Sequence, residues 1–211
     1  MAVDTHGLEA IRKSAELVTP GDKSNCYLKT AIRASDGSPI TSDDCTNALT
    51  TIDYAHHEIH EGSHYYIQGF LELADEAVFR VKLVTPDVAK WAHFVFSISS
   101  TGICSTTFDE DASGGMANGA AVVPINNNRN SENTSGLVLT SGVTAASTYV
   151  KRLENDKWGA QGFKQNIGGG SGREDEFMLK QNTTYLRTFT SGADDNIIQF
   201  RASWYEHTSC S

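Results

Sequence analysis

Residues 51–66, read TIDYAHHEIHEGSHYY, hold the densest set of side chains in this sequence that could do chemistry. Four of the chain's seven histidines fall within nine residues there, at His56, His57, His60 and His64, and Glu58 lies among them. Imidazoles and carboxylates this close together could hold a metal ion or transfer protons. A metal-dependent hydrolase is therefore the first chemical hypothesis to weigh.

The spacing of these residues argues against the usual zinc-protease arrangement. That motif needs histidines at positions i and i+4 of a helix, whereas the two histidines of the HEIH string are three apart. His56, His60 and His64 do have helical spacing, but Gly62 interrupts the last turn and no capping pattern favours a helix of that length. On a strand, His56, Glu58 and His60 would share a face and could offer three metal ligands.

We expect a hydrogen-bond network in this segment rather than a metal site. Histidine, tyrosine and glutamate together commonly form such networks inside a protein or at an interface between subunits. No catalytic residue, metal ligand or cofactor is predicted, and the chain is expected not to be an enzyme. The residues predicted to lie at interfaces are His56, His57, Glu58, His60, His64, Trp158 and Arg173.

Tryptophans and loops supply the remaining candidates. Trp91 and Trp204 lie in strong strand sequence and are predicted to be core residues, whereas Trp158, in a glycine-rich loop, is predicted to be exposed or buried against a neighbour. Arg173, next to acidic residues, is read as a surface or intersubunit ion pair. The glycine run at 168–172 lacks the Lys-Ser/Thr of a phosphate-binding loop, and the acidic residues 109–111 lack calcium-loop spacing, so both are read as connections.

Composition and charge limit the class of protein. The 211 residues are 39% hydrophobic and 20% charged, which is ordinary for a soluble globular chain with one substantial core. The formal net charge of −9, with scattered lysines and arginines, disfavours binding to nucleic acid. Because there is no apolar run of about 18 residues and the first nineteen residues carry three acidic side chains, we expect neither a membrane protein nor a Sec-exported one.

The four cysteines, Cys26, Cys45, Cys104 and Cys210, form no C-x-x-C pair. This excludes the sequence signatures of a zinc ribbon and of a thioredoxin-like redox site, and free thiols in a reducing cytosol are expected at synthesis. Cys26 and Cys45 are the pair close enough in sequence for a local disulfide, which stays open as an alternative.

Hydrophobic patterning predicts two regions. Residues 1–50 are rich in turns and contain one short helical possibility at 7–18, which indicates an extended or partly helical N-terminal arm with too few large apolar residues for its own core. Residues 51–211 read as a domain of about ten short strands with almost no helix after residue 60. Short strands without βαβ alternation predict a mainly β fold, an antiparallel β-sandwich of jelly-roll type. The predicted strands are 64–73, 78–84, 91–99, 103–108, 120–125, 136–139, 147–152, 177–179, 183–189 and 196–205.

Several long strings resemble a family of tailed-bacteriophage virion proteins encoded among head and structural genes. They are TIDYAHHEIHEGSHYYI, VKLVTPDVAKWAHFVF, NNNRNSENTSG, KQNIGGGSGREDEFMLKQNTTYL and SWYEHT, which occur in a consistent order between Ala48 and Thr208. The resemblance implies a non-enzymatic structural protein, a capsid decoration or cement protein that is made in the host bacterial cytoplasm and sits on the capsid exterior. It further implies the major capsid protein as partner and a homotrimer as the oligomer, and it supplies no catalytic residue.

A second hypothesis from another class is a fibre or adhesin module, borne on the head or tail, that binds host-surface glycans. It is motivated by Trp158, the glycine-rich loops and the polar residues Asn126 to Asn130. Neither hypothesis involves a membrane or a nucleic acid.

Overall fold

The computed structural model describes residues 54–159, 167–170 and 175–208. All of them belong to the second of the two units into which the chain divides, Asp53–Ser211. The predicted arm at 1–50 lies outside the described residues, as do Cys26, Cys45 and Cys210. In the part of the chain that is described, no helix is long and apolar enough to cross a membrane.

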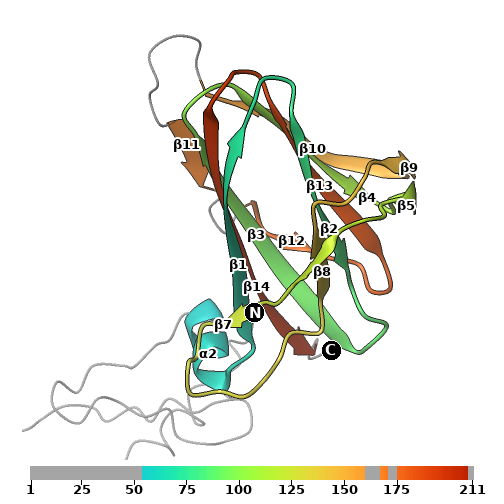
Figure 1. Cartoon of the computed structure of the whole chain (residues 1–211). Helices are drawn as coiled ribbons and strands as arrows, with labels where there is room; N and C mark the ends of the chain where they lie inside the picture. Colours follow the sequence, from blue (N-terminus) through green and yellow to red (C-terminus); the bar gives the residue numbers. More distant parts are fainter. Residues whose placement is uncertain (1–53, 160–166, 171–174, 209–211) are drawn as a thin grey trace, which may run out of the picture. The chain divides into compact units, whose positions relative to one another are not determined.

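Two antiparallel sheets face one another in the described unit (Figure 1). Sheet one has the strand order β11 (Ile167–Gly170), β3 (Lys90–Ser100), β14 (Asn196–Thr208), β1 (His64–Leu73) and β7 (Ile125–Asn126), and β12 (Phe177–Met178) also pairs with β3. Sheet two has the order β10 (Lys151–Trp158), β4 (Cys104–Glu110), β13 (Thr184–Ser191), β2 (Val78–Val84), β8 (Val138–Ser141) and β6 (Ala120–Val122). Helix α2 (Tyr54–Glu61) precedes β1.

The connectivity of the eight main strands is that of a jelly roll. In that fold the first strand pairs with the last, the last with the third and the third with the sixth, while the second, seventh, fourth and fifth strands line up in the other sheet. Here β1, β14, β3 and β11 take the first set of places, and β2, β13, β4 and β10 take the second. The predicted mainly β, jelly-roll-like sandwich is therefore confirmed.

Alternation of apolar side chains sets the register of the long strands. In β14, Ile198, Phe200, Ala202 and Trp204 are buried at every second position, and β1 buries Tyr65 and Ile67 in the same way. Because successive side chains of a strand point to opposite faces, this period of two turns one face of sheet one toward sheet two. The strong alternation is why these strands could be found in the sequence.

Aromatic rings fill the space between the sheets. Tyr65 lies beside Trp204 at 6.2 Å between ring centroids, Trp204 beside Phe94 at 6.1 Å, Phe94 beside Phe108 at 5.7 Å, and Phe108 beside Tyr185 at 5.4 Å. The series begins on β1 in sheet one and ends on β13 in sheet two. Offset ring pairs at these distances each add about 0.5–1.5 kcal/mol beyond the area they bury. The aromatic core thus joins the two sheets.

An insertion between β4 and β10 extends both sheets. Its strands β8 and β6 continue sheet two beyond β2, and β7 adds to β1 at the edge of sheet one. Its remaining strands, β5 (Ser113–Gly115) and β9 (Ala146–Thr148), form a two-stranded sheet of their own. Ala112 and Val143 of the insertion pack against Leu186 of β13 and form a small second core.

Four sequence expectations are corrected by the fold. Strand β10 overlaps the strand predicted at 147–152 and continues to Trp158, which was expected in a glycine-rich loop, and the glycines at 168–170 belong to strand β11. Trp91 is only half buried and projects from the face of β3 opposite to the buried Ala92, so its predicted place in the core is wrong. Asp109 and Glu110, expected in a solvated loop, end strand β4 and are 5% and 6% exposed. Trp204, 1% exposed, is the core residue that the sequence predicted.

Candidate functional site

The histidine-rich segment forms the short helix α2 and the start of β1. The expectation that Gly62 keeps a helix from reaching His64 is confirmed, and the alternative that His56, Glu58 and His60 lie on a strand is wrong. The helix ends at Glu61, and the next residue, Gly62, has a φ of 73°, in the left-handed region. The Gly62 amide donates to the Ile59 carbonyl at 3.1 Å and the Ser63 amide to the Glu58 carbonyl at 2.9 Å. His64 therefore lies outside the helix, on the first residue of β1.

His56 and His60 form an exposed pair on α2. Their Nε2 atoms are 3.0 Å apart and their ring centroids 4.8 Å apart. His57 lies on another side of the helix, with Nδ1 3.6 Å from Glu58 and Nε2 3.8 Å from Glu61. The described residues contain no cluster of three or more histidine, cysteine or acidic side chains placed to bind one metal ion.

Glu58 fastens the corner between α2 and β1. Glu58 is 5% exposed, and its side chain accepts a hydrogen bond from the Ser63 hydroxyl. A carboxylate buried in this way needs such donors, because an unpartnered charge would be costly to desolvate. The geometry gives Glu58 a role in holding the turn.

His64 connects β1 to the insertion. Its Nδ1 lies 2.8 Å from the Nδ2 of Asn127, and its ring stacks toward Tyr205 with centroids 6.5 Å apart. Asn126, next to Asn127, is 7% exposed and donates to the carbonyls of Gly62 and Asn133. The polar run at 126–130 is therefore used, in part, to hold the end of α2.

Trp158 lies in strand β10, and its predicted place in a loop is wrong. The side chain is half buried and packs against the core between the two sheets, and its buried Nε1 has no hydrogen-bond partner among the described residues. Because of this packing, less of the indole surface is exposed for stacking on a sugar than the adhesin hypothesis requires. Arg173 lies outside the described residues.

A second histidine cluster, which the sequence reasoning missed, lies on the outer face of sheet one. His93 on β3 places its Nδ1 2.5 Å from Oε1 of Glu176 and its Nε2 2.8 Å from the Nε2 of His207 on β14. Tyr205 donates its hydroxyl to the same Glu176 oxygen at 2.9 Å and stacks on His93 at 4.5 Å between centroids. We call His64, His93, Glu176, Tyr205 and His207 the outer histidine cluster.

The signal for this cluster was present in the sequence but could not be read alone. His93 lies between the buried Ala92 and Phe94, and His207 follows the buried Glu206. Because successive side chains of a strand point to opposite faces, both histidines point away from the core. Their partnership depends on the pairing of β3 with β14, in which Tyr205 lies opposite His93. That pairing joins residues more than a hundred positions apart.

Glu206 anchors the insertion from inside the sandwich. It is 6% exposed and accepts hydrogen bonds from the Ser135 hydroxyl at 2.5 Å, the Gly136 amide at 3.0 Å and the Trp204 indole at 2.9 Å. Burial, with the negative charge of Glu206 as the second cause, raises the pKa of Tyr65. Glu206 thus holds residues 135–136 against β14.

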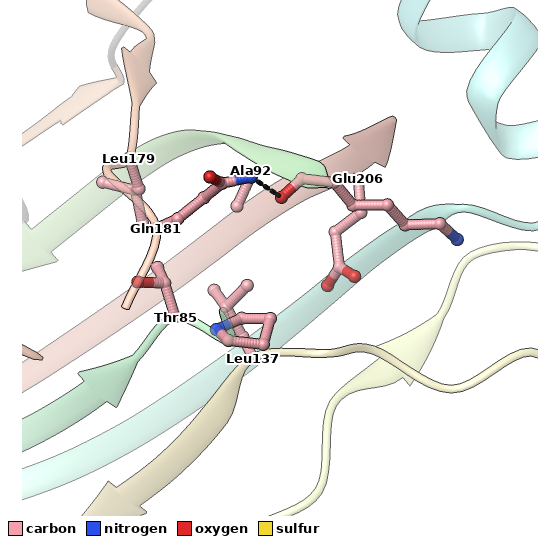
Figure 2. A pocket seen from close by; sticks show the side chains of 8 residues that line it. Thr85, Ala92, Leu137, Leu179, Gln181 and Glu206 are labelled. Atoms are coloured by element: carbon pink, nitrogen blue, oxygen red, sulfur yellow. Dashed lines mark hydrogen bonds between the residues drawn. The ribbon is translucent and has the colours of Figure 1, made fainter. Parts of the chain in front are cut away.

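A small pocket opens beside Glu206 (Figure 2). Its lining includes Thr85, Leu137, Leu179 and Gln181, and Gln181 donates to the Lys90 carbonyl at 3.5 Å. The cavity volume of about 10 Å³ is enough for about one water molecule. A pocket of this size can hydrate Glu206 but cannot enclose a substrate.

The acidic end of β4 forms ion pairs with neighbouring strands and loops. Asp109 accepts two hydrogen bonds from Arg152, at 2.7 and 3.2 Å, and Glu110 accepts one from Lys180 at 2.7 Å. The Tyr185 hydroxyl also reaches Glu110 at 3.3 Å, and burial is the main cause that raises the pKa of Tyr185. These carboxylates are held by cations and hydroxyls rather than presented in an open cleft.

No protein-family model, no curated protein and no solved structure matches the chain. The function of this protein is therefore argued from its fold and from the polar clusters described above.

Proposed function

We propose that this protein is a non-enzymatic structural component of a tailed-bacteriophage virion, a decoration or cement protein that binds the exterior of the capsid. The proposal starts from the strings that resemble phage virion proteins, TIDYAHHEIHEGSHYYI and SWYEHT among them, which lie on α2, β1 and β14. Its partners are the major capsid protein and further copies of this chain, with a trimer as the expected oligomer by analogy with other capsid-binding proteins.

The observation that carries the proposal is a jelly-roll sandwich whose buried carboxylates serve as anchors. Glu58 holds the α2–β1 corner, Glu206 holds residues 135–136, and Asp109 and Glu110 pair with Arg152 and Lys180. A general acid or base must reach a substrate proton, whereas these side chains are buried and bound within the chain. Jelly rolls of this kind are common among viral capsid proteins.

An exposed apolar surface offers a place where such a protein could dock. Val123 directly follows β6 and is 82% exposed, and Val138 on β8 is 61% exposed. Val122 pairs with Leu139 at the end of the antiparallel ladder, so Val123 and Val138 are the next residues beyond that pair on the two chain segments. We call these two residues the valine patch, and we place it in the contact with the capsid.

Co-sedimentation with capsids tests the function. Purified protein is mixed with mature capsids that lack it, the capsids are pelleted, and the bound protein is measured together with the temperature at which the capsids open. The proposal expects saturable binding and a higher opening temperature. Protein that stays in the supernatant contradicts it, and binding to host cell envelopes or glycans instead would favour the adhesin alternative.

A further inference from the structure

We infer that residues 67–73, the second part of strand β1, form a docking edge for the same edge of a second copy of this chain. The two strands pair antiparallel about a twofold axis at Phe70, so that sheet one continues from one copy into the other. The inference goes beyond the proposed virion role and does not rest on it. Because a twofold contact closes with two copies, it is separate from the trimer contact proposed above.

Strand β1 has a neighbour along only part of its far edge. On one side, all ten of its residues pair in unbroken register with β14, from His64 opposite Tyr205 to Leu73 opposite Asn196. On the other side, β7 lies beside the start of β1 and pairs with Tyr65 and Tyr66 (Figure 1). In the described part of the chain, residues 67–73 have no strand beside them on that second side. We call this stretch the open edge.

Two backbone hydrogen bonds show which residues face the open edge. The Asn127 amide, just after β7, donates to the His64 carbonyl at 2.9 Å, and the Glu206 amide on β14 donates to the Ser63 carbonyl at 3.0 Å. Within an antiparallel strand, the N–H and C=O of one residue point to the same side, and successive residues alternate. Every second residue from His64 onward therefore turns its backbone groups away from β14. Within the open edge these residues are Gln68, Phe70 and Glu72.

The open edge lacks the features by which edge strands avoid pairing with other chains. Such features are β-bulges, prolines and charged side chains, lysine above all. Strand β10, at the edge of sheet two, has a register shift after Arg152 and carries Lys151 and Lys157. The open edge, read IQGFLEL, has no proline, one charged side chain at Glu72, and a regular register. It is therefore a regular edge to which a further strand can pair.

One register uses all three open residues. With a twofold axis at Phe70, the two Phe70 residues lie opposite each other, and Gln68 of each copy lies opposite Glu72 of the other. Each of these pairs can exchange both N–H···O bonds. A shift by two residues would set one open residue opposite Tyr66, which β7 already occupies, or opposite Ala74, beyond the end of β1. The length of the open edge thus selects the register.

The side chains are self-complementary in this register. Phe70 is 61% exposed, and an aromatic pair directly opposite across an antiparallel ladder is stabilising. The Gln68 amide can donate to the Glu72 carboxylate of the second copy, since an ionised carboxylate only accepts. The two Glu72 side chains lie about 14 Å apart along the strands, beyond the screening length of about 8–10 Å. Like charges are therefore not brought together.

The size of the contact predicts its strength. A single strand edge buries far less than the roughly 1,200–2,000 Å² of a stable interface. We therefore expect a reversible contact with a dissociation constant in the range of about 10 µM to 1 mM.

Sedimentation of the full chain over this concentration range, with a reductant to keep the thiols free, tests the contact. We expect the mass of the particle to double reversibly as the concentration rises, from monomer to dimer or, for a trimeric chain, from trimer to hexamer. A mass that stays constant up to about 1 mM overturns the inference.

Variants at exposed positions test the register. Gln68→Glu sets two carboxylates against Glu72 of the second copy and should weaken the association about tenfold. Adding Glu72→Gln exchanges the two side chains, restores the complementary pairs and should recover wild-type association. Phe70→Asp should abolish association, whereas Val150→Asp, at a position 77% exposed, should not change it. Unfolding temperatures equal to wild type confirm that each variant is folded. Association that is unchanged in Gln68→Glu and Phe70→Asp, or that the exchange does not restore, overturns the inference.

Amide hydrogen exchange by NMR identifies what occupies the open edge. The amides of Gln68, Phe70 and Glu72 should exchange fast in dilute protein and slowly in concentrated protein. The amides of Ile67 and Leu71 face β14 and should be protected at both concentrations. Protection of the three open residues that persists on dilution would mean that another part of the same chain covers the edge, which overturns the assignment to a second copy.

Discussion

Among single residues, Arg187 occupies the position least expected for a charge. It projects from β13 into the space between the sheets, is 4% exposed, and lies over the Phe96 ring at 4.0 Å. Its guanidinium donates to Glu154 on β10 and to the Thr106 hydroxyl at 3.4 Å, while its buried Nε has no hydrogen-bond partner in the part of the chain that the structure describes. Burial lowers the pKa of Arg187, and the charge of Glu154 opposes that change.

Arg187→Ala should destabilise the fold by about 3–5 kcal/mol, because it leaves Glu154 as an unpaired, largely buried charge. Arg187→Met combined with Glu154→Leu should recover most of that loss, since two apolar side chains need no partner. Urea unfolding measures both. Arg201→Ala is the control, because the exposed Arg201 stacks on Tyr66 at 4.1 Å and its loss should cost about 0.5–1 kcal/mol. If Arg187→Ala and Arg201→Ala lowered the free energy of unfolding equally, the buried Arg187–Glu154 pair would not be needed for stability.

Cys104 gives a pH dependence with a defined sign. It is fully buried, and burial raises the pKa of its thiol from 9.0 to about 11. The folded chain keeps this proton where the unfolded chain loses it, so the thiol's contribution to stability is complete below about pH 9 and is lost as the pH rises toward 11. The stability difference between wild type and Cys104→Ala should therefore shrink by about 1 kcal/mol from about pH 8 to about pH 10, measured by urea unfolding. A difference that stays constant over this range would mean that the thiol is not desolvated.

The cluster of histidines near position 60 could be recognised in the sequence. The contacts of the other buried or clustered polar residues could not be predicted from it. His93 and Glu176 are 83 residues apart, and His93 and His207 are 114 apart, so their contact depends on strand pairing that no local pattern encodes. Arg187 reads as an ordinary charged residue within a β strand, and its burial follows from the inward direction that it shares with Tyr185 and Phe189.

At the scale of elements, the turn after α2 depends on Gly62. A Cβ at this position would lie 2.3 Å from the Ser131 hydroxyl oxygen and 2.7 Å from the Ser131 Cβ, and the backbone has a φ of +73°. Gly142 is a matched control, because its φ is +71° and a Cβ there would meet nothing within 4 Å. The two sites separate backbone strain from crowding.

Gly142→Ala should cost about 1–2 kcal/mol from the left-handed backbone alone. Gly62→Ala should cost more, since Ser131 and the connection that holds the end of α2 must also move. Thermal and urea unfolding of the two variants measure the difference. A Gly62→Ala variant as stable as Gly142→Ala would mean that α2 is not fixed against the insertion.

Strands with a clear apolar alternation were predictable, and strands without it were not. The prediction of 78–84 matches β2, and that of 196–205 covers most of β14, because each buries every second side chain in a continuous core. The sequence of β10 has polar residues on both faces apart from Leu153 and Trp158, as an edge strand can, and its register shifts between Arg152 and Glu154. The jelly-roll order itself was inferred from the class of fold rather than from any strand.

At the scale of the whole molecule, the valine patch is the surface on which the proposed docking can be tested. Val123→Asp combined with Val138→Asp places two charges on exposed apolar side chains and should leave the fold intact. If the patch lies in the contact, binding to capsids should fall at least tenfold, because a charge would be desolvated against an apolar surface. Val150→Asp is the control, since Val150 is 77% exposed and lies between β9 and β10. Equal binding by the patch variant and the control would remove the patch from the contact.

The measurement that tests the central claim most directly is the copy number of this protein in purified phage particles, obtained by mass spectrometry relative to the major capsid protein. A decoration protein that follows the capsid lattice should be present in hundreds of copies, in a fixed ratio to the capsid subunits. A few dozen copies or fewer would place it at a vertex, neck or tail, and its absence from particles would contradict a virion role altogether.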